Sequence, residues 1–276
     1  MAVTTGSSPA SVLLERRRAL CRPLVMGIVN VTGDSFYAAS RTAAADAAVA
    51  AAETMAEAGA DLLDLGGEST RPGSEPVPVE EELRRVLPVL ERVSGRLRIP
   101  LSIDTSKPEV AARAFDAGAS VLNDVLALRA PGMPEAARRY PLVVLMHMLG
   151  DSPKTMQAAP RYGDVVAEVA SFLRGRMEAF DSAGRVWLDP GIGFGKTAEH
   201  NLDLLRNLET FTALAPVLVG ASRKSFLGAG GPEHRLAGSL AAACRAAQAG
   251  AVCVRVHDVK ETVLALDAWK SMGGAG

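Results

Sequence analysis

The chain has 276 residues, of which 48% are hydrophobic and 22% are charged, and its 30 basic and 31 acidic residues leave a formal charge of −1. This balance argues against nucleic acid or an anionic membrane as the main partner. The three cysteines have neither the spacing of a zinc site nor that of a disulfide framework. No window approaches the roughly 18 uninterrupted apolar residues that a membrane span needs, so we expect a cytoplasmic protein.

Short apolar runs recur along the chain, and each ends in a polar residue or a glycine. Runs of this length, rich in Val, Ile and Leu, are typical of strands buried in a parallel sheet. In chain order the eight runs are 24–30, 61–66, 101–104, 120–123, 142–147, 186–189, 217–220 and 252–255.

The segments between these runs have the length and the signals of helices. Residues 42–58 are rich in alanine and stop at Gly59, and residues 79–93 place apolar side chains near a period of 3.6 after an acidic first turn. Pro108 stands where a first-turn proline belongs, and Gly118 follows the helical stretch 109–117. The same Ala-Gly-Ala joint surrounds Gly59, Gly118 and Gly250, so each of these glycines is expected to end a helix.

Eight strands that alternate with helices predict parallel pairing and, at this length, an α/β fold with a single (β/α)₈ TIM barrel. An open doubly wound sheet is the alternative, but no Gly-x-Gly-x-x-Gly motif follows the first strand. We expect residues 1–23 to form a partly disordered extension, residues 24–272 the barrel domain, and residues 273–276 a flexible tail.

Polar residues stand at the carboxyl ends of the predicted strands, where a barrel enzyme builds its active site. Any one of them is also a reasonable helix cap, but such residues follow all eight strands. They are Asn30, Glu68 to Gly73, Asp104, Asn123 with Asp124, His147, Asp189, Ser222 to Lys224, and Arg255 with His257.

The chemistry of these groups divides in two. Asp104, Asn123 and Asp189 offer carboxylate and amide groups that can bind a flat, nitrogen-rich ring in a dry pocket. Cationic side chains suited to a multiply charged phosphate come from Arg255, His257 and Lys224, with Arg71 nearby. Asn30 offers a neutral ligand for Mg²⁺ held mainly by phosphate oxygens. A ring that carries a phosphate leaving group is therefore the ligand that these residues suggest.

Several motifs in this order resemble the signatures of the dihydropteroate synthases, and the resemblance runs from about residue 24 to residue 269. The first two motifs are Met26-Gly27-Ile28-Val29-Asn30-Val31-Thr32 with Asp34-Ser35-Phe36, and Asp64-Leu65-Gly66-Gly67-Glu68-Ser69-Thr70-Arg71-Pro72-Gly73. The later ones are Ser102-Ile103-Asp104-Thr105, Asn123-Asp124, Met146-His147-Met148, Leu188-Asp189-Pro190-Gly191-Ile192-Gly193-Phe194-Gly195-Lys196, Ser222-Arg223-Lys224-Ser225 and Arg255-Val256-His257-Asp258-Val259.

By this resemblance, the chain is a transferase of folate synthesis that joins 6-hydroxymethyl-7,8-dihydropterin diphosphate to 4-aminobenzoate and releases diphosphate. The resemblance also implies a Mg²⁺ cofactor, a homodimer formed through the last helices, and a sulfonamide target. The implied pterin-binding residues are Asp104, Asn123, Met146, Asp189, Phe194 and Lys224. Asn30, Arg255 and His257 would bind diphosphate, with Asn30 also at the metal. Thr70, Arg71, Pro72, Phe194 and Ser225 would bind 4-aminobenzoate, and the catalytic group would be Asp34, Phe36, Arg71 and Lys224.

One stretch departs from the family. Tyr37-Ala38-Ala39-Ser40 replaces the usual Ser-Asp-Gly-Gly after the first motif, and Gly33 stands where proline is common. Losing two glycines and a carboxylate is expected to alter how this loop closes over the amine site. Three alternatives stay open: a barrel enzyme with Lys224 as a Schiff-base lysine, a pterin-binding methyltransferase domain, and a pterin-binding paralogue without catalysis.

Overall fold

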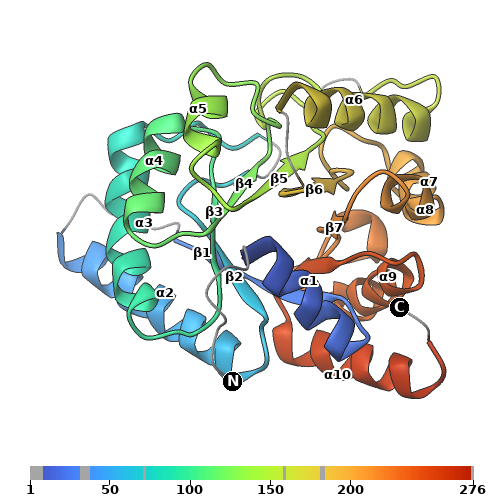
Figure 1. Ribbon diagram of the computed structural model, residues 1–276, viewed down its shortest axis with the longest axis horizontal. Coiled ribbons are helices and arrows are strands. Elements are labelled where there is room, and N and C mark those ends of the chain that lie inside the picture. The colour runs from blue at the N-terminus through green and yellow to red at the C-terminus, as the bar shows by residue number, and fades with distance from the viewer. Residues whose placement is uncertain (1–8, 32–37, 71–72, 158–159, 181–183, 275–276) are drawn as a thin grey trace.

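The computed structural model describes residues 9–31, 38–70, 73–157, 160–180 and 184–274, and these form a ring of parallel strands surrounded by helices (Figure 1). The strand order in the sheet is β6-β5-β4-β3-β2-β1-β8-β7, and a bridge between Leu188 and Val217 joins its two ends. The predicted single (β/α)₈ barrel is confirmed, and the open sheet is excluded. The strands, each within one residue of its predicted bounds, are β1 (Leu24–Asn30), β2 (Leu62–Gly66), β3 (Leu101–Asp104), β4 (Val121–Asp124), β5 (Leu142–Met146), β6 (Val186–Asp189), β7 (Leu218–Val219) and β8 (Cys253–Val256).

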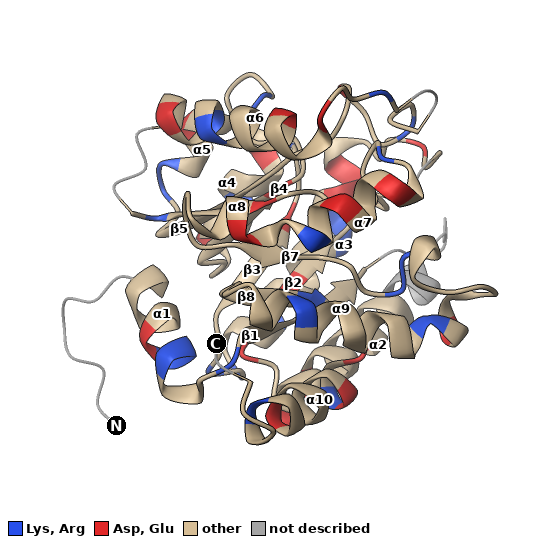
Figure 2. Ribbon diagram, turned by 90° about the vertical axis from the view of Figure 1, so that its right-hand side faces the viewer, with Lys and Arg blue, Asp and Glu red and all other residues tan. Residues whose placement is uncertain are grey.

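Helices cover the outside of the ring, and charges of both signs are mixed over them (Figure 2). None of the described helices is long and apolar enough to cross a membrane. The helices are α1 (Pro9–Leu20), α2 (Ala38–Glu57), α3 (Val79–Ser94), α4 (Pro108–Asp116), α5 (Met133–Ala137), α6 (Val165–Phe180), α7 (Ala198–Arg206), α8 (Leu208–Thr212), α9 (Leu236–Gln248) and α10 (Val259–Ser271), with short 3₁₀ turns η1 (Ser225–Leu227) and η2 (Pro232–Arg235).

The predicted helix stops are confirmed by backbone geometry. The φ angle is +97° at Gly59, +107° at Gly118 and +80° at Gly250, in the left-handed region that glycine enters without a Cβ penalty. Helix α2 begins at Ala38, four residues before the predicted start at Thr42. Alanine has the highest helix propensity, so the unusual Ala38-Ala39-Ser40 segment continues α2 backwards instead of forming a loop.

Strand side chains alternate between the helix layer and the barrel interior, as the twofold period of a strand requires. The barrel interior near the amino-terminal ends of the strands, called here the lower interior, is apolar. It contains residues such as Leu62, Val121, Trp187 and Cys253. Helix α1 packs against this layer through the buried side chains of Ala10 and Leu13. Two arginines, Arg16 and Arg22, form ion pairs with the fully buried Asp61 at this end. The lower end of the barrel is therefore filled, and the open end is the one where the strands finish.

Candidate active site

The interior side chains become polar towards the carboxyl ends of the strands. Four polar residues each lie two positions after a residue of the lower apolar layer, so their side chains share its inward direction. They are Asp64, Asn123, Asp189 and Arg255. Strand register places Asp104 opposite Asn123 on β4, and Met146 opposite Asp189 on β6. The residues expected to bind the ring therefore come together on adjacent strands.

A network of carboxylates, an amide and a guanidinium forms the floor of this site. Arg255 donates from Nε to Asp64 Oδ2 at 2.6 Å and from Nη2 to Asp104 Oδ2 at 2.8 Å. Asn123 donates from Nδ2 to the same Asp64 Oδ2 at 2.9 Å. Among the described residues, the buried Oδ1 of Asp104 has no hydrogen-bond partner. Burial raises the pKa of Asp104 to about 7, although the Arg255 charge opposes the shift.

Asp189 is the third buried carboxylate of the floor. Its Oδ1 accepts a hydrogen bond from the backbone N–H of Gly191 at 2.7 Å. Burial raises its pKa to about 6, against the effects of this N–H and of the Lys224 charge. Lys224 places its ammonium group 4.3 Å from the centre of the Phe194 ring. These contacts bring Asp189, Phe194 and Lys224 to one side of the site, as the pterin-binding prediction requires.

An apolar wall stands beside the polar floor. It is a separate cluster of buried apolar side chains, and the partly buried Leu126 packs against it. Such a wall can pack against the face of a flat ring. Its buried members are Val125, Met146, Met148, Met156 and Phe194.

A buried lysine ties together the loops that carry this wall. Lys196 is 3% exposed, and its Nζ lies 2.9 Å from His147 Nδ1. The same Nζ donates to the carbonyl oxygens of Gly191 and Phe194 at 3.0 and 3.1 Å. Burial lowers the pKa of Lys196 to about 7 and that of His147 to about 3. This lysine anchor holds the loop after β5 against the loop after β6.

The groups expected at the diphosphate surround the ends of β1 and β8. Asn30 is exposed at the last position of β1. His257 Nδ1 lies 3.0 Å from Ser222 Oγ, and burial together with the nearby Arg223 and Arg255 charges lowers the pKa of His257 to about 4. The imidazole is therefore neutral near pH 7 and can offer an N–H donor to a phosphate, while Arg255 supplies positive charge.

Apart from Phe194, the residues expected to bind 4-aminobenzoate follow β2 and β7 along the chain. Thr70 is partly exposed and Ser225 is exposed, whereas four of the predicted residues, Asp34, Phe36, Arg71 and Pro72, lie outside the described residues.

An ion cluster holds the start of the loop that carries Thr70. Lys107 donates to the carboxylates of Glu68 and Glu82. Glu82 is fully buried, and burial raises its pKa against the opposing effect of Lys107. The charge of Lys107 compensates the two carboxylates, and the cluster ties the loop after β2 to α3.

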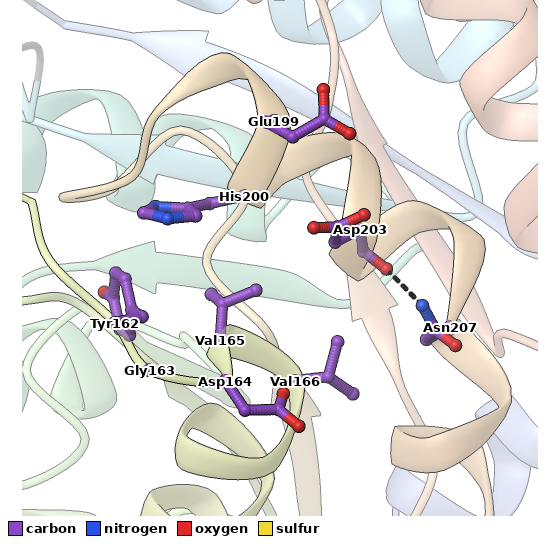
Figure 3. A pocket seen from close by; sticks show the side chains of 9 residues that line it. All are labelled: Tyr162, Gly163, Asp164, Val165, Val166, Glu199, His200, Asp203 and Asn207. Carbon is purple, nitrogen blue, oxygen red and sulfur yellow. Dashed lines mark hydrogen bonds between the residues drawn. The ribbon is translucent and has the colours of Figure 1, made fainter.

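A cavity of about 650 Å³ lies away from the strand ends, between the start of α6 and helix α7 (Figure 3). The rings of Tyr162 and His200 meet edge to face in it, with centroids 5.0 Å apart. Tyr162 Oη donates to the carbonyl of Gly195 at 3.0 Å, which links this outer surface to the loop of the lysine anchor. No strand-end residue lines the cavity, so we do not assign the substrate site to it.

The open end of the barrel gathers three buried carboxylates, an amide, an apolar wall and a flanking arginine and lysine. This arrangement defines a TIM-barrel enzyme for a polar ring. A family model described as "Pterin binding enzyme" matches residues 26–257. The dihydropteroate synthase of Escherichia coli K12 is 49% identical over 256 residues, covering 90% of both chains.

Solved structures agree with this similarity. Dihydropteroate synthase of Xanthomonas albilineans with 4-aminobenzoic acid has a TM-score of 0.85 and 51% identity, covering 93% of this chain and 95% of the other. The same enzyme with 7,8-dihydropteroate has a TM-score of 0.80 and 48% identity, with coverage of 93% and 95%. The chain belongs to the dihydropteroate synthases, which are transferases of the pterin-binding enzyme family.

Two residues at the centre of the site were not singled out by the sequence. Asp64 lies in one of the motifs and is the only charged residue of its apolar strand, where it is fully buried. Lys196 ends the Gly-rich motif after β6. An isolated charge inside an apolar run was the available signal for Asp64, whereas nothing local distinguished Lys196 from a surface lysine.

Proposed function

We propose that the chain condenses 6-hydroxymethyl-7,8-dihydropterin diphosphate with 4-aminobenzoate to give 7,8-dihydropteroate and diphosphate. The observation that carries the proposal is the floor of the site, where Asp104, Asn123 and Asp189 lie at the carboxyl ends of their strands and the buried Oδ1 of Asp104 has no partner among the described residues. Buried acceptors without partners favour a ligand rich in N–H groups. Asp104, Asn123, Asp189 and Lys224 would bind the pterin ring, and Met146 and Phe194 would pack against it.

The same residues account for the chemistry of the transfer. As the bond from the methylene carbon to the diphosphate oxygen loosens, positive charge spreads over the pterin-methyl group, and the carboxylates beneath it favour that charge. The N–H groups of Arg255 that are not bound to Asp64 or Asp104, together with His257, would stabilise the departing diphosphate. The amine of 4-aminobenzoate then attacks the methylene carbon and loses a proton, so that no covalent enzyme intermediate is needed.

The Mg²⁺ requirement belongs to this proposal. Among the described residues, no group of three or more His, Cys, Asp or Glu side chains is arranged to hold a metal ion. The exposed amide oxygen of Asn30 at the end of β1 is a hard ligand, which fits a cation held mostly by diphosphate oxygens and water. When bound there, Mg²⁺ would neutralise part of the charge on the leaving group.

We also propose a cytoplasmic homodimer formed through the last helices. Leu264 on α10 is 60% exposed, and Met272, the first residue after the end of α10, is 80% exposed. Such side chains favour a protein partner over water. Sedimentation of the wild type and of a Leu264→Glu variant tests the contact: a shift of the variant towards monomer supports it, and identical sedimentation would contradict it.

One assay separates the proposed reaction from its alternatives. Diphosphate release from the pterin diphosphate is measured with and without 4-aminobenzoate, in the presence of Mg²⁺. The synthase reaction predicts release that depends on the amine and yields dihydropteroate. Tight pterin binding without release would instead support a non-catalytic paralogue, and transfer from a methylated folate would support the methyltransferase reading.

A further inference from the structure

A single carboxylate oxygen links three of the ligand-facing side chains. Asp64 lies in the middle of β2 and has no exposed surface. Its Oδ2 accepts from both Asn123 Nδ2 and Arg255 Nε, and the other arm of Arg255 reaches Asp104. Asp64 therefore lies beneath the site and touches residues of β4 and β8, while Arg255 connects it to β3.

The charge of Asp64 decides which way the Asn123 amide faces. An ionised carboxylate only accepts hydrogen bonds, so Asn123 must present its NH₂ group to Asp64. The carbonyl oxygen of Asn123 is then directed away from Asp64, at the inward-facing end of β4. With the Asp104 and Asp189 carboxylates, this oxygen makes a floor of acceptors, which selects a ring edge that carries donors.

We propose that Asp64 is a positioning residue that sets ring selectivity by fixing the Asn123 amide and the Arg255 fork. This inference rests on the proposed placement of the pterin above Asp104 and Asn123. With a neutral amide at position 64, the Asn123 side chain can turn over and offer either a donor or an acceptor. The variant then discriminates less between rings whose donors and acceptors differ.

The test uses Asp64→Asn, which keeps the volume of the side chain and removes its charge. Calorimetry measures the binding of 6-hydroxymethylpterin and of its lumazine analogue, in which an oxo group replaces the 2-amino donor. For the wild type we expect the pterin to bind roughly 100-fold more tightly, because a mismatched analogue leaves buried acceptors unpaired. In Asp64→Asn we expect this ratio to fall by roughly tenfold.

Asp61→Asn is the matched control. Asp61 is also fully buried, lies immediately before the same strand, and accepts from Arg22 and from the backbone N–H of Val25. This variant is expected to lower the unfolding temperature while leaving the pterin-to-lumazine ratio unchanged. A loss of stability alone therefore cannot reproduce the predicted result.

Two further measurements keep the failures apart. If Asn123→Ala binds the pterin as tightly as the wild type, the proposed pterin site is wrong. If Asn123→Ala loses affinity but Asp64→Asn keeps the full ratio, only the role of Asp64 is wrong. Should Asp64→Asn not fold, a crystal structure of the wild type with 6-hydroxymethylpterin decides: both contacts to Asp64 retained support the inference, and loss of either one overturns it.

Discussion

Most of the candidate ring-binding residues at the barrel mouth belong to strands, whereas the candidate amine-binding residues belong to loops. Asp104 and Asp189 end β3 and β6, and Asn123 is the last residue but one of β4. Strand register together with buried hydrogen bonds holds them. Thr70 and Ser225 follow their strands, and both are at least partly exposed. The comparison indicates that the residues proposed to bind the ring are held mainly by the sheet, whereas those proposed to bind the amine lie in loops, the more variable part of a barrel.

The largest effect is expected at the lysine anchor. Lys196→Met removes the donor to His147 and to the carbonyls of Gly191 and Phe194, leaving buried acceptors unpaired at about 1–3 kcal/mol each. We expect the free energy of unfolding, measured by urea denaturation, to fall by about 4 kcal/mol. We also expect the KM for the pterin diphosphate to rise. The control is Lys154→Met, which breaks only an exposed ion pair with Glu75 and should cost less than about 1 kcal/mol.

The carboxylates of the floor come next. Asp104→Ala or Asp189→Ala should weaken pterin binding about 100-fold, or about 2.7 kcal/mol, because charge-assisted hydrogen bonds to the ring are lost. Each side chain lies at a strand end, so the fold should persist. Calorimetric titration with 6-hydroxymethylpterin measures the change, with Asp116→Ala on the exposed surface of α4 as the control. Near-normal affinity in both site variants would reject the assignment.

Lowering the pH should reduce the free energy of unfolding, because His147 is held neutral in the folded chain. Its pKa is lowered to about 3 in the folded chain, so the unfolded chain binds more protons between that value and about 6.5. Stability from the neutral imidazole is thus complete above pH 6.5 and is lost as the pH falls, by roughly 2 kcal/mol at pH 5.

The raised pKa values of Asp104 and Asp189 have the opposite effect: they increase the free energy of unfolding as the pH falls, because the folded state binds more protons at these groups. The measurement is therefore the difference in unfolding free energy between wild type and His147→Gln at pH 7 and pH 5. A difference that does not change with pH would contradict the assignment to His147.

A smaller effect distinguishes the two ends of the pterin substrate. His257→Ala should weaken the pterin diphosphate roughly 20-fold while leaving the diphosphate-free pterin almost unchanged, since only a phosphate contact is removed. Arg255→Ala should weaken both ligands, because Arg255 also holds Asp64 and Asp104. Competition binding with the two ligands tests this pattern, and equal losses in His257→Ala would place that histidine at the ring.

The smallest effect is expected on the loop side. Tyr37-Ala38-Ala39-Ser40 replaces the usual Ser-Asp-Gly-Gly, and Ala38 to Ser40 are already helical in α2. Rebuilding the usual segment restores two glycines and should improve kcat/KM for 4-aminobenzoate about tenfold, or about 1.4 kcal/mol. Pterin affinity serves as the internal control and should not change. Kinetics of the rebuilt enzyme that match the parent would remove the idea of a loop defect.

Several features could be predicted because their causes are local. Buried strands need continuous apolar runs, and their ends match the predicted ones to within one residue. Helices that end at Gly59, Gly118 and Gly250 need a left-handed residue. The start of α2 was predicted wrongly: the alanine-rich stretch was placed from Thr42, whereas the helix begins at Ala38, as the helix propensity of alanine favours.

The remaining features depend on contacts between distant residues. Arg255 is 191 residues from Asp64 and 151 residues from Asp104 along the chain. No short sequence window therefore contains either pair. The Ser222-Arg223-Lys224 stretch offered two adjacent cations, yet Arg223 forms an ion pair with Asp258 while Lys224 lies over Phe194. Strand curvature and loop packing decide which of two neighbouring cations faces the site.

The sequence by itself determined the alternation of strands and helices, the barrel, and the residue types at the strand ends, because burial and helix termination act on neighbouring residues. Only the tertiary structure decided how those residues are paired. Closing the ring brought β8 beside β1 and placed Arg255 within reach of β2 and β3. Desolvation at the closed mouth then raised the pKa of Asp104 and of Asp189, since charges lose the stabilisation by water when a closed barrel surrounds them.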